Sequence, residues 1–259
     1  MLEKEAKLCY SYFSTVKRKM QFMTRLYKKS PLFFALSFIA IYIVGASVFD
    51  MLSEKIGTEH LFSLIFLAAL SLILVLFIIK NKLQGEFGLC RPLGKAKNFL
   101  YFIPLIAVSS FNLLFGFKKI VIFDAVLAAV YMVFVGFIEE LIFRGLLFKA
   151  MERDNVKAAV TVSAVTFGIG HIINLLNGAP FFSTLLQIIS AVAFGFLYVI
   201  LFLKTKSLLP CILSHIAINV TSVFTATAKN EAIDILLTLF LCIICISYSI
   251  FLKKIKKLC

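Results

Sequence analysis

Charged residues are scarce in this sequence. Only 15% of its 259 residues are charged, whereas 61% are hydrophobic, and the mean hydropathy is +1.01. Soluble globular domains average about 45–50% apolar and about 25% charged residues, so the chain falls outside that class. Its 29 Phe and 8 Tyr residues also exclude a disordered chain, because such chains are polar and poor in aromatics. The composition therefore predicts an all-α, polytopic membrane protein.

Several common site patterns are absent as well. The six cysteines follow neither a disulfide framework nor a zinc-ligand spacing, and the pair Cys242-x-x-Cys245 lies inside an apolar run. Neither an HExxH helix nor a GxSxG turn occurs. No cleavable signal peptide is evident, since the first apolar run begins at Pro31 and is too long for one. Any chemistry must therefore come from other residues.

Apolar runs divide the chain into helices that could cross a bilayer. About 20 apolar residues in a helix span about 30 Å of hydrocarbon. We expect about eight such helices, at residues 31–49, 61–79, 99–117, 121–148, 157–177, 181–203, 208–228 and 232–252. They form one membrane domain over 31–252, followed by a basic tail at 253–259. Apolar residues three and four apart in the basic segment 1–30 predict an amphipathic helix, lying on the cytoplasmic leaflet or packed on the bundle.

The basic residues are distributed unevenly over the expected loops. With eight spans, 22 of the 27 Lys and Arg residues fall on one side, which holds both termini, and four fall on the other. Because positive charge stays cytoplasmic, both termini are expected there. The net charge of +14 thus reflects membrane topology, and we expect no nucleic-acid partner.

Six polar side chains lie where the spans should be apolar: Glu139, Glu140 and Arg144 in the fourth, His171 in the fifth, and His215 with Asn219 in the seventh. Such groups are costly in a bilayer and are a functional signal by default. Glu140 and Arg144 share a helix face at i,i+4, which favours a structural ion pair. Glu139 is rotated about 100° away and escapes that pairing.

The depths of three of these residues agree. At about 1.5 Å of rise per residue, Glu139, His171 and His215 lie about 15, 21 and 14 Å from the basic edge of the membrane. Three helices with alternating directions thus place their ionisable groups near one level. The sequence predicts a single buried polar site.

Two kinds of chemistry fit these residues. A carboxylate and a His can activate water as a general base, while a second His and an Asn donate hydrogen bonds to an oxyanion. The same set, Glu139, His171 and His215, could instead hold zinc with an open coordination position. A non-catalytic binding protein and a proton-coupled transporter are the competing functions.

Three motifs in this order resemble the CPBP family of type II CaaX prenyl proteases and bacteriocin-processing or immunity proteins. They are Glu139-Glu140-x-x-x-Arg144, Phe167-x-x-x-His171 and His215-x-x-x-Asn219, preceded by Phe87-Gly88-Leu89-x-Arg91-Pro92. The resemblance covers roughly residues 85–228, which would form a peptidase-like core.

The resemblance implies an intramembrane endopeptidase of glutamate type that needs no cofactor. Glu139 would be the catalytic base, His171 would help to activate water, and His215 with Asn219 would stabilise the oxyanion. Glu140 and Arg144 would support the site. The expected partners are membrane lipid and a membrane-associated peptide or protein substrate, in a bacterial cell membrane. An immunity or scaffold protein that binds a peptide is the alternative.

Overall fold

The computed structural model describes residues 18–92, 102–226 and 230–255, and these are almost entirely helical. The sole β feature among them is an isolated bridge between Phe117 and Thr225. Residues 18–29 form a first helix. The helices that follow are α2 (Pro31–Lys55), α3 (Leu61–Lys80), α4 (Ile103–Ser109), the 3-10 helix η2 (Phe111–Phe115), α5 (Ile122–Glu140), the π-helix η3 (Leu141–Phe148), α6 (Lys149–Glu152), α7 (Val156–Gly170), α8 (Ile173–Leu176), α9 (Phe181–Thr205), α10 (Leu209–Phe224) and α11 (Glu231–Lys254).

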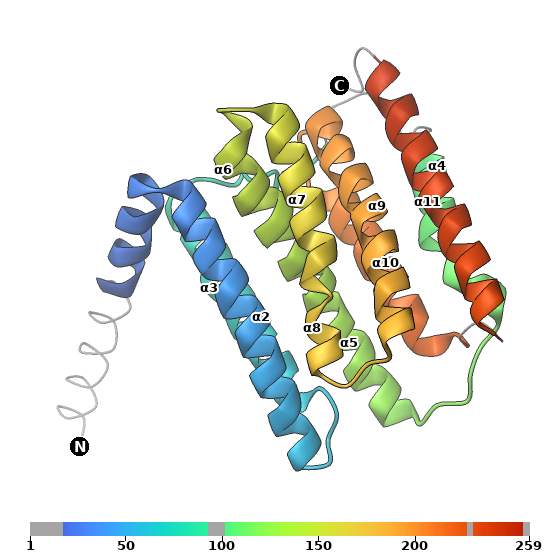
Figure 1. Ribbon diagram of the computed structural model, residues 1–259. Coiled ribbons are helices and arrows are strands. Elements are labelled where there is room, and N and C mark those ends of the chain that lie inside the picture. Colours follow the sequence, from blue (N-terminus) through green and yellow to red (C-terminus); the bar gives the residue numbers. More distant parts are fainter. Residues whose placement is uncertain (1–17, 93–101, 227–229, 256–259) are drawn as a thin grey trace, which may run out of the picture.

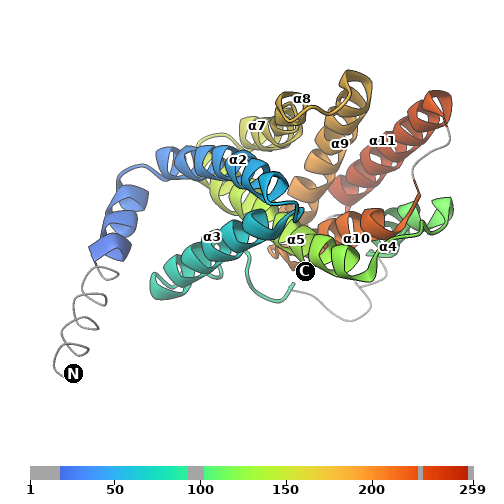
Figure 2. The ribbon, with the colours of Figure 1, turned by 90° about the horizontal axis from the view of Figure 1, so that it is seen from below.

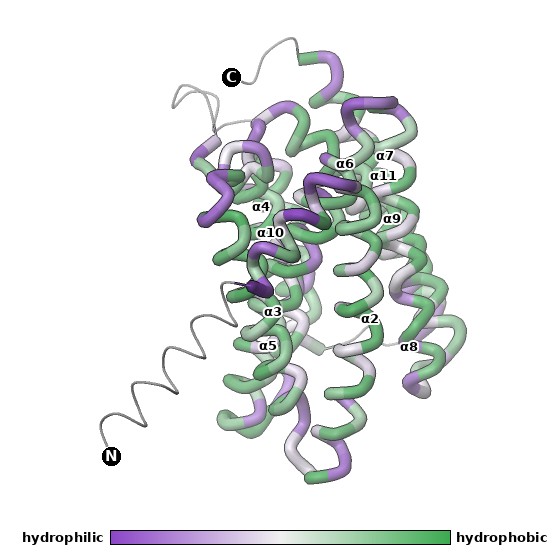
Figure 3. The backbone as a smooth tube through the Cα atoms, turned by 90° about the vertical axis from the view of Figure 1, so that its left-hand side faces the viewer, coloured by the Kyte–Doolittle hydropathy of each residue, from purple (hydrophilic) through white to green (hydrophobic). Residues whose placement is uncertain are grey.

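Six helical segments in the described part of the chain are long and apolar enough to cross a membrane. They lie at residues 31–55, 61–80, 122–152, 156–176, 181–205 and 231–254. Figure 3 shows hydrophobic residues along these helices and hydrophilic ones concentrated toward their ends. The expected membrane architecture is therefore confirmed, but the count of eight is not.

The two other expected spans have a different form. The described part of 99–117 is broken into the seven-residue α4 and the five-residue η2. The expected span at 208–228 is the 16-residue α10, which is about 24 Å long and short of a full bilayer crossing. Both segments are apolar, so hydropathy alone could not reveal the break or the short length.

The described part of the N-terminal segment packs on the bundle. Tyr27 places its ring 5.5–5.8 Å from those of Phe34, Phe77 and Phe87, edge-on to each. Its hydroxyl donates to Glu86 at 3.1 Å. Burial, reinforced by the Glu86 carboxylate, raises the pKa of Tyr27 to about 12. The expected amphipathic helix over 1–30 stays a prediction, because residues 1–17 lie outside the described part.

The long helices lie roughly along one axis and alternate in direction, and the bundle has one strongly basic end. Figure 1 places the start of α2, the end of α3, the α6–α7 and α9–α10 turns and the end of α11 at its upper end. These are the segments with most of the described Lys and Arg residues. In the view along the bundle, α5 lies centrally, between the α2–α3 pair and α10 (Figure 2).

Two features surround the polar site: a close contact between α5 and α10, and a change from α-helix to π-helix after α5. A Cβ on Gly136 of α5 would lie 2.9–3.2 Å from Ile216 atoms of α10, backbone included, so glycine permits this approach. One turn later α5 becomes the π-helix η3, all eight residues of which are buried. Single π turns are frequent at functional sites. The carbonyl of Phe143 in η3 accepts a hydrogen bond from Ser163 of α7 at 2.8 Å.

Candidate active site

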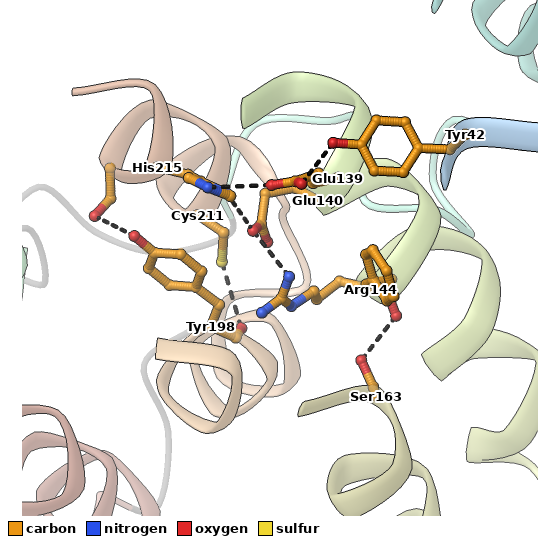
Figure 4. Close-up of polar contacts among 10 residues, drawn as sticks. Tyr42, Glu139, Glu140, Arg144, Ser163, Tyr198, Cys211 and His215 are labelled. Atoms are coloured by element: carbon orange, nitrogen blue, oxygen red, sulfur yellow. Dashed lines mark hydrogen bonds and ion pairs between the residues drawn. The ribbon is translucent and has the colours of Figure 1, made fainter. Parts of the chain in front are cut away.

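Glu139 and Glu140, at the end of α5, both reach His215 of α10. Nδ1 of His215 lies 2.8 Å from Oε1 of Glu140, and Nε2 lies 3.4 Å from Oε2 of Glu139 (Figure 4). The three residues are buried, with exposed fractions of 0–8%. Two adjacent residues on one helix can contact one imidazole because its nitrogens point in different directions.

Arg144 completes this group from within the π-helix. Its Nη1 donates to Oε1 of Glu140 at 3.0 Å, and both side chains are fully buried. The guanidinium stands 4.1 Å over the ring of Phe167 and 5.6 Å from that of Tyr198. Among the described residues, Nε and Nη2 of Arg144 and Oε2 of Glu140 have no hydrogen-bond partner. The expected ion pair between Glu140 and Arg144 is thus present and buried.

Phe167 links the two histidines. Its ring meets His171 at 5.6 Å and His215 at 5.7 Å, edge-on in both cases. His171 lies where α7 ends, before the short α8, so the predicted continuous helix over 157–177 is interrupted at this residue. The break leaves His171 half-buried.

A cavity of about 90 Å³ lies beside Glu139 and His171. Its wall also includes Tyr42, Asp50, Tyr131 and Asn177. A water molecule needs about 10–15 Å³ of such space, so the cavity has room for several. The described geometry therefore places a buried carboxylate and an imidazole on one polar, water-sized chamber.

This cavity continues toward the end of the bundle opposite the basic end. A second cavity, of about 620 Å³, shares Asp50 and Asn177 with the first and is also lined by Glu54, Glu59 and His60. Asp50 accepts a hydrogen bond from Ser63 and so lies between α2 and α3.

Residues 121–221 match the family model of the type II CAAX prenyl endopeptidase Rce1-like proteins. This match supports membership of the CPBP family. The matched segment holds Glu139, Glu140, Arg144 and His215 as well as His171 and Asn219. CPBP membership implies CAAX-type protease activity in general and, together with the apolar helices, an integral membrane protein. No curated protein and no solved structure gives a significant match.

One contact to the CPBP motif lies outside the matched segment. The hydroxyl of Tyr42, in α2, donates to Oε1 of Glu139 at 2.6 Å. Tyr42 belongs to no motif, because the family resemblance begins near residue 85 and one Tyr in an apolar span is common. The only available signal was a polar hydroxyl within a predicted span.

Asn219 is not part of the hydrogen-bonded group in the described structure. It follows His215 by one turn of α10, is half-buried, and accepts through its backbone oxygen from Ser222. Asn174, near His171, donates instead to Gln187 of α9 at 2.8 Å.

The zinc alternative finds little support in the described geometry. Among the described residues no group of three or more His, Cys, Asp or Glu side chains is arranged to hold a metal ion. Nδ1 of His215 bonds Glu140, and one oxygen of Glu139 accepts from Tyr42. The four described cysteines are free, in agreement with the sequence prediction.

Proposed function

We propose that this CPBP protein is an intramembrane endopeptidase in which Glu139 activates water. The observation that supports this most is the carboxylate of Glu139 on the wall of a buried, water-sized cavity that it shares with His171. Burying a carboxylate within the membrane costs free energy, so a carboxylate at this depth is a functional signal by default. General base catalysis contributes about 10²–10⁴ in rate.

The reaction follows from the placement of the groups. Glu139 takes a proton from a cavity water while the water oxygen bonds to the carbonyl carbon of the scissile peptide. The carbonyl π electrons move to oxygen and form an oxyanion. When this intermediate collapses, the C–N bond breaks and the proton held by Glu139 passes to the leaving amine. His171, on the same wall, helps to orient the water.

His215 supplies the second half of the site. A ring that donates Nδ1–H to Glu140 turns Nε2 toward Glu139. When both ring nitrogens carry a proton, Nε2–H can donate to the oxyanion while Nδ1–H stays on Glu140. Asn219 is the second donor carried over from the family motif. Arg144 holds Glu140, and Glu140 in turn holds the imidazole in this orientation.

The direction in which the cavity opens supports one class of substrate. The cavity wall runs along α2 from Tyr42 to Asp50 and leads to the less basic end of the bundle. With basic residues cytoplasmic, that end faces away from the cytoplasm. Peptides or proteins associated with the outer surface of a bacterial membrane are therefore the proposed substrates.

A comparison of the wild type with Glu139→Ala tests this function. Both proteins are expressed at matched membrane levels in a deletion host, and the peptides of the host are compared. Peptide termini that depend on Glu139 would identify a protease and its substrate together. Identical profiles, with the variant still restoring the host phenotype, would favour a non-catalytic binding protein.

Metal content is a separate measurement. The purified, active protein is analysed for zinc before and after dialysis against a chelator. Activity without bound zinc is expected from the hydrogen bonds already made by Glu139 and His215. One zinc ion per chain, with activity lost on its removal and restored on its return, would overturn the metal-free mechanism.

A further inference from the structure

The two oxygens of Glu139 have different partners. Oε1 accepts the hydroxyl of Tyr42 at 2.6 Å, and Oε2 faces Nε2 of His215 at 3.4 Å. Tyr42 and His215 come from α2 and α10, on opposite sides of α5, as Figure 4 shows. The carboxylate is thus held between two helices that lie far apart in the sequence.

We propose that Tyr42 is a positioning residue for Glu139. This inference rests on the proposed function of Glu139 as the base. A carboxylate has about four acceptor sites, so the hydrogen bond to Oε1 and the contact of Oε2 with His215 leave further sites for water. Tyr42 holds Oε1 and His215 faces Oε2, so the two contacts together set the plane of the carboxylate. The acceptor sites that remain free then point in a fixed direction relative to the cavity.

The packing of α2 against α3 fixes the place of Tyr42 next to Glu139. The rings of Phe34 and Phe38 of α2 lie 4.8 Å apart, and the Phe34 ring lies 4.9 Å from that of Phe77 of α3. These rings are buried and anchor α2 on the basic side of Tyr42. The matched family segment begins only at residue 121, so α2 supplies from outside that segment a partner that the base requires.

The hydrogen bond is charge-assisted and lies inside the protein. Hydrogen bonds with an ionised partner are shorter and about twice as strong as neutral ones. The short O–O distance of 2.6 Å agrees with such a bond. Its loss would free the Glu139 side chain to rotate, which harms a reaction that depends on the alignment of the base.

The first experiment compares Tyr42→Phe with Ser37→Ala. Ser37 belongs to the same helix, is half-buried like Tyr42, and donates its hydroxyl only to the Phe33 carbonyl in the described structure. Its variant is therefore the matched control for loss of a hydroxyl. The probe is an internally quenched peptide that carries a cleavage sequence identified by the comparison of the wild type with Glu139→Ala. For Tyr42→Phe we expect kcat to fall about 10- to 100-fold with KM and melting temperature nearly unchanged. Ser37→Ala should match the wild type.

A pH–rate profile adds a readout that a packing role would not move. Tyr42→Phe removes a hydrogen bond to the carboxylate of Glu139, so the shape of its pH–rate profile should differ from that of the wild type. Coincident profiles, or a kcat that equals the wild-type value, would overturn the positioning role while leaving the proposed protease intact.

A spectroscopic experiment needs no substrate. The carboxyl band of Glu139 is assigned in infrared difference spectra by its absence in Glu139→Gln. The position of the band should differ between wild type and Tyr42→Phe and be unchanged in Ser37→Ala. An unchanged band in Tyr42→Phe would overturn the inference whether or not a probe is cleaved. Identical host peptide profiles for the wild type and Glu139→Ala, with an altered band, would count against the proposed activity alone.

Discussion

Nδ1 of His215 lies 2.8 Å from Oε1 of Glu140, the same oxygen that accepts from Arg144. Glu140 therefore has two tasks, since it neutralises a buried guanidinium and fixes the ring that faces Glu139. The sequence motif predicted only the first of these. The supporting carboxylate and the proposed base are coupled through one imidazole, so a change in either should alter the other.

Arg144→Ala should reduce folding more than activity per folded molecule. The variant leaves Glu140 buried next to an empty space, and breaking a buried ion pair costs about 3–5 kcal/mol in soluble proteins. We expect low membrane yield and a lower melting temperature. The double variant Glu140→Gln/Arg144→Met, which removes both charges, should melt above Arg144→Ala. A normal yield and melting curve for Arg144→Ala would contradict this view of the pair.

Phe167→Leu should lower kcat more than KM. The ring contacts both imidazoles and carries the Arg144 guanidinium at 4.1 Å, and such aromatic and cation–π contacts are worth about 0.5–2 kcal/mol each. Phe202→Leu is the control, since Phe202 is equally buried in α9 but packs on Phe148. Both variants should lose similar stability. If both also keep the same kcat, Phe167 has no special part in the site.

Gly136→Ala should push α5 and α10 apart. Its new methyl group would lie 3.0 Å from the backbone nitrogen of Ile216, and overpacking costs about 1–3 kcal/mol. Because Glu139 and His215 lie next to this contact, peptide cleavage should fall along with the melting temperature. Gly85→Ala, whose methyl group would meet nothing within 4 Å, serves as the control. Wild-type cleavage by Gly136→Ala would show that the helix spacing is not critical.

A cysteine at position 47 should report the direction of the cavity. Ser47 lines the cavity beside Glu139, whereas native Cys90 lies at the basic end, where its sulfur contacts the Lys206 carbonyl. In backgrounds that retain only the cysteine under test, a membrane-impermeant maleimide should modify Ser47→Cys in intact cells. Cys90 should react only after permeabilisation. The reverse pattern would place the entrance on the cytoplasmic side.

Much of the site could be predicted from the sequence because its members lie at fixed spacings on helices. The i,i+4 spacing predicted the contact between Glu140 and Arg144, and rise per residue placed Glu139 and His215 at one depth. The structure brings these side chains together. The roles of the predicted site residues stay proposals, and Asn219 is not in contact with the group.

Other features could not be read from the pattern. Hydropathy does not distinguish an α-helix from a π-helix, so the change after Glu140 was not expected. The breaks at His171 and within 99–117 were missed for the same reason, since polar and apolar residues there continue a helical pattern. Tyr42 was missed because its partner is 97 residues away.

The sequence by itself determined that the chain is a helical membrane protein with ionisable residues at one depth, because hydropathy and helical rise act along each segment. Only the tertiary structure decided which faces of these helices meet. The rotation of each helix about its axis depends on contacts with distant segments, such as Gly136 against Ile216. That rotation places Tyr42 on Glu139 and directs the cavity toward Asp50.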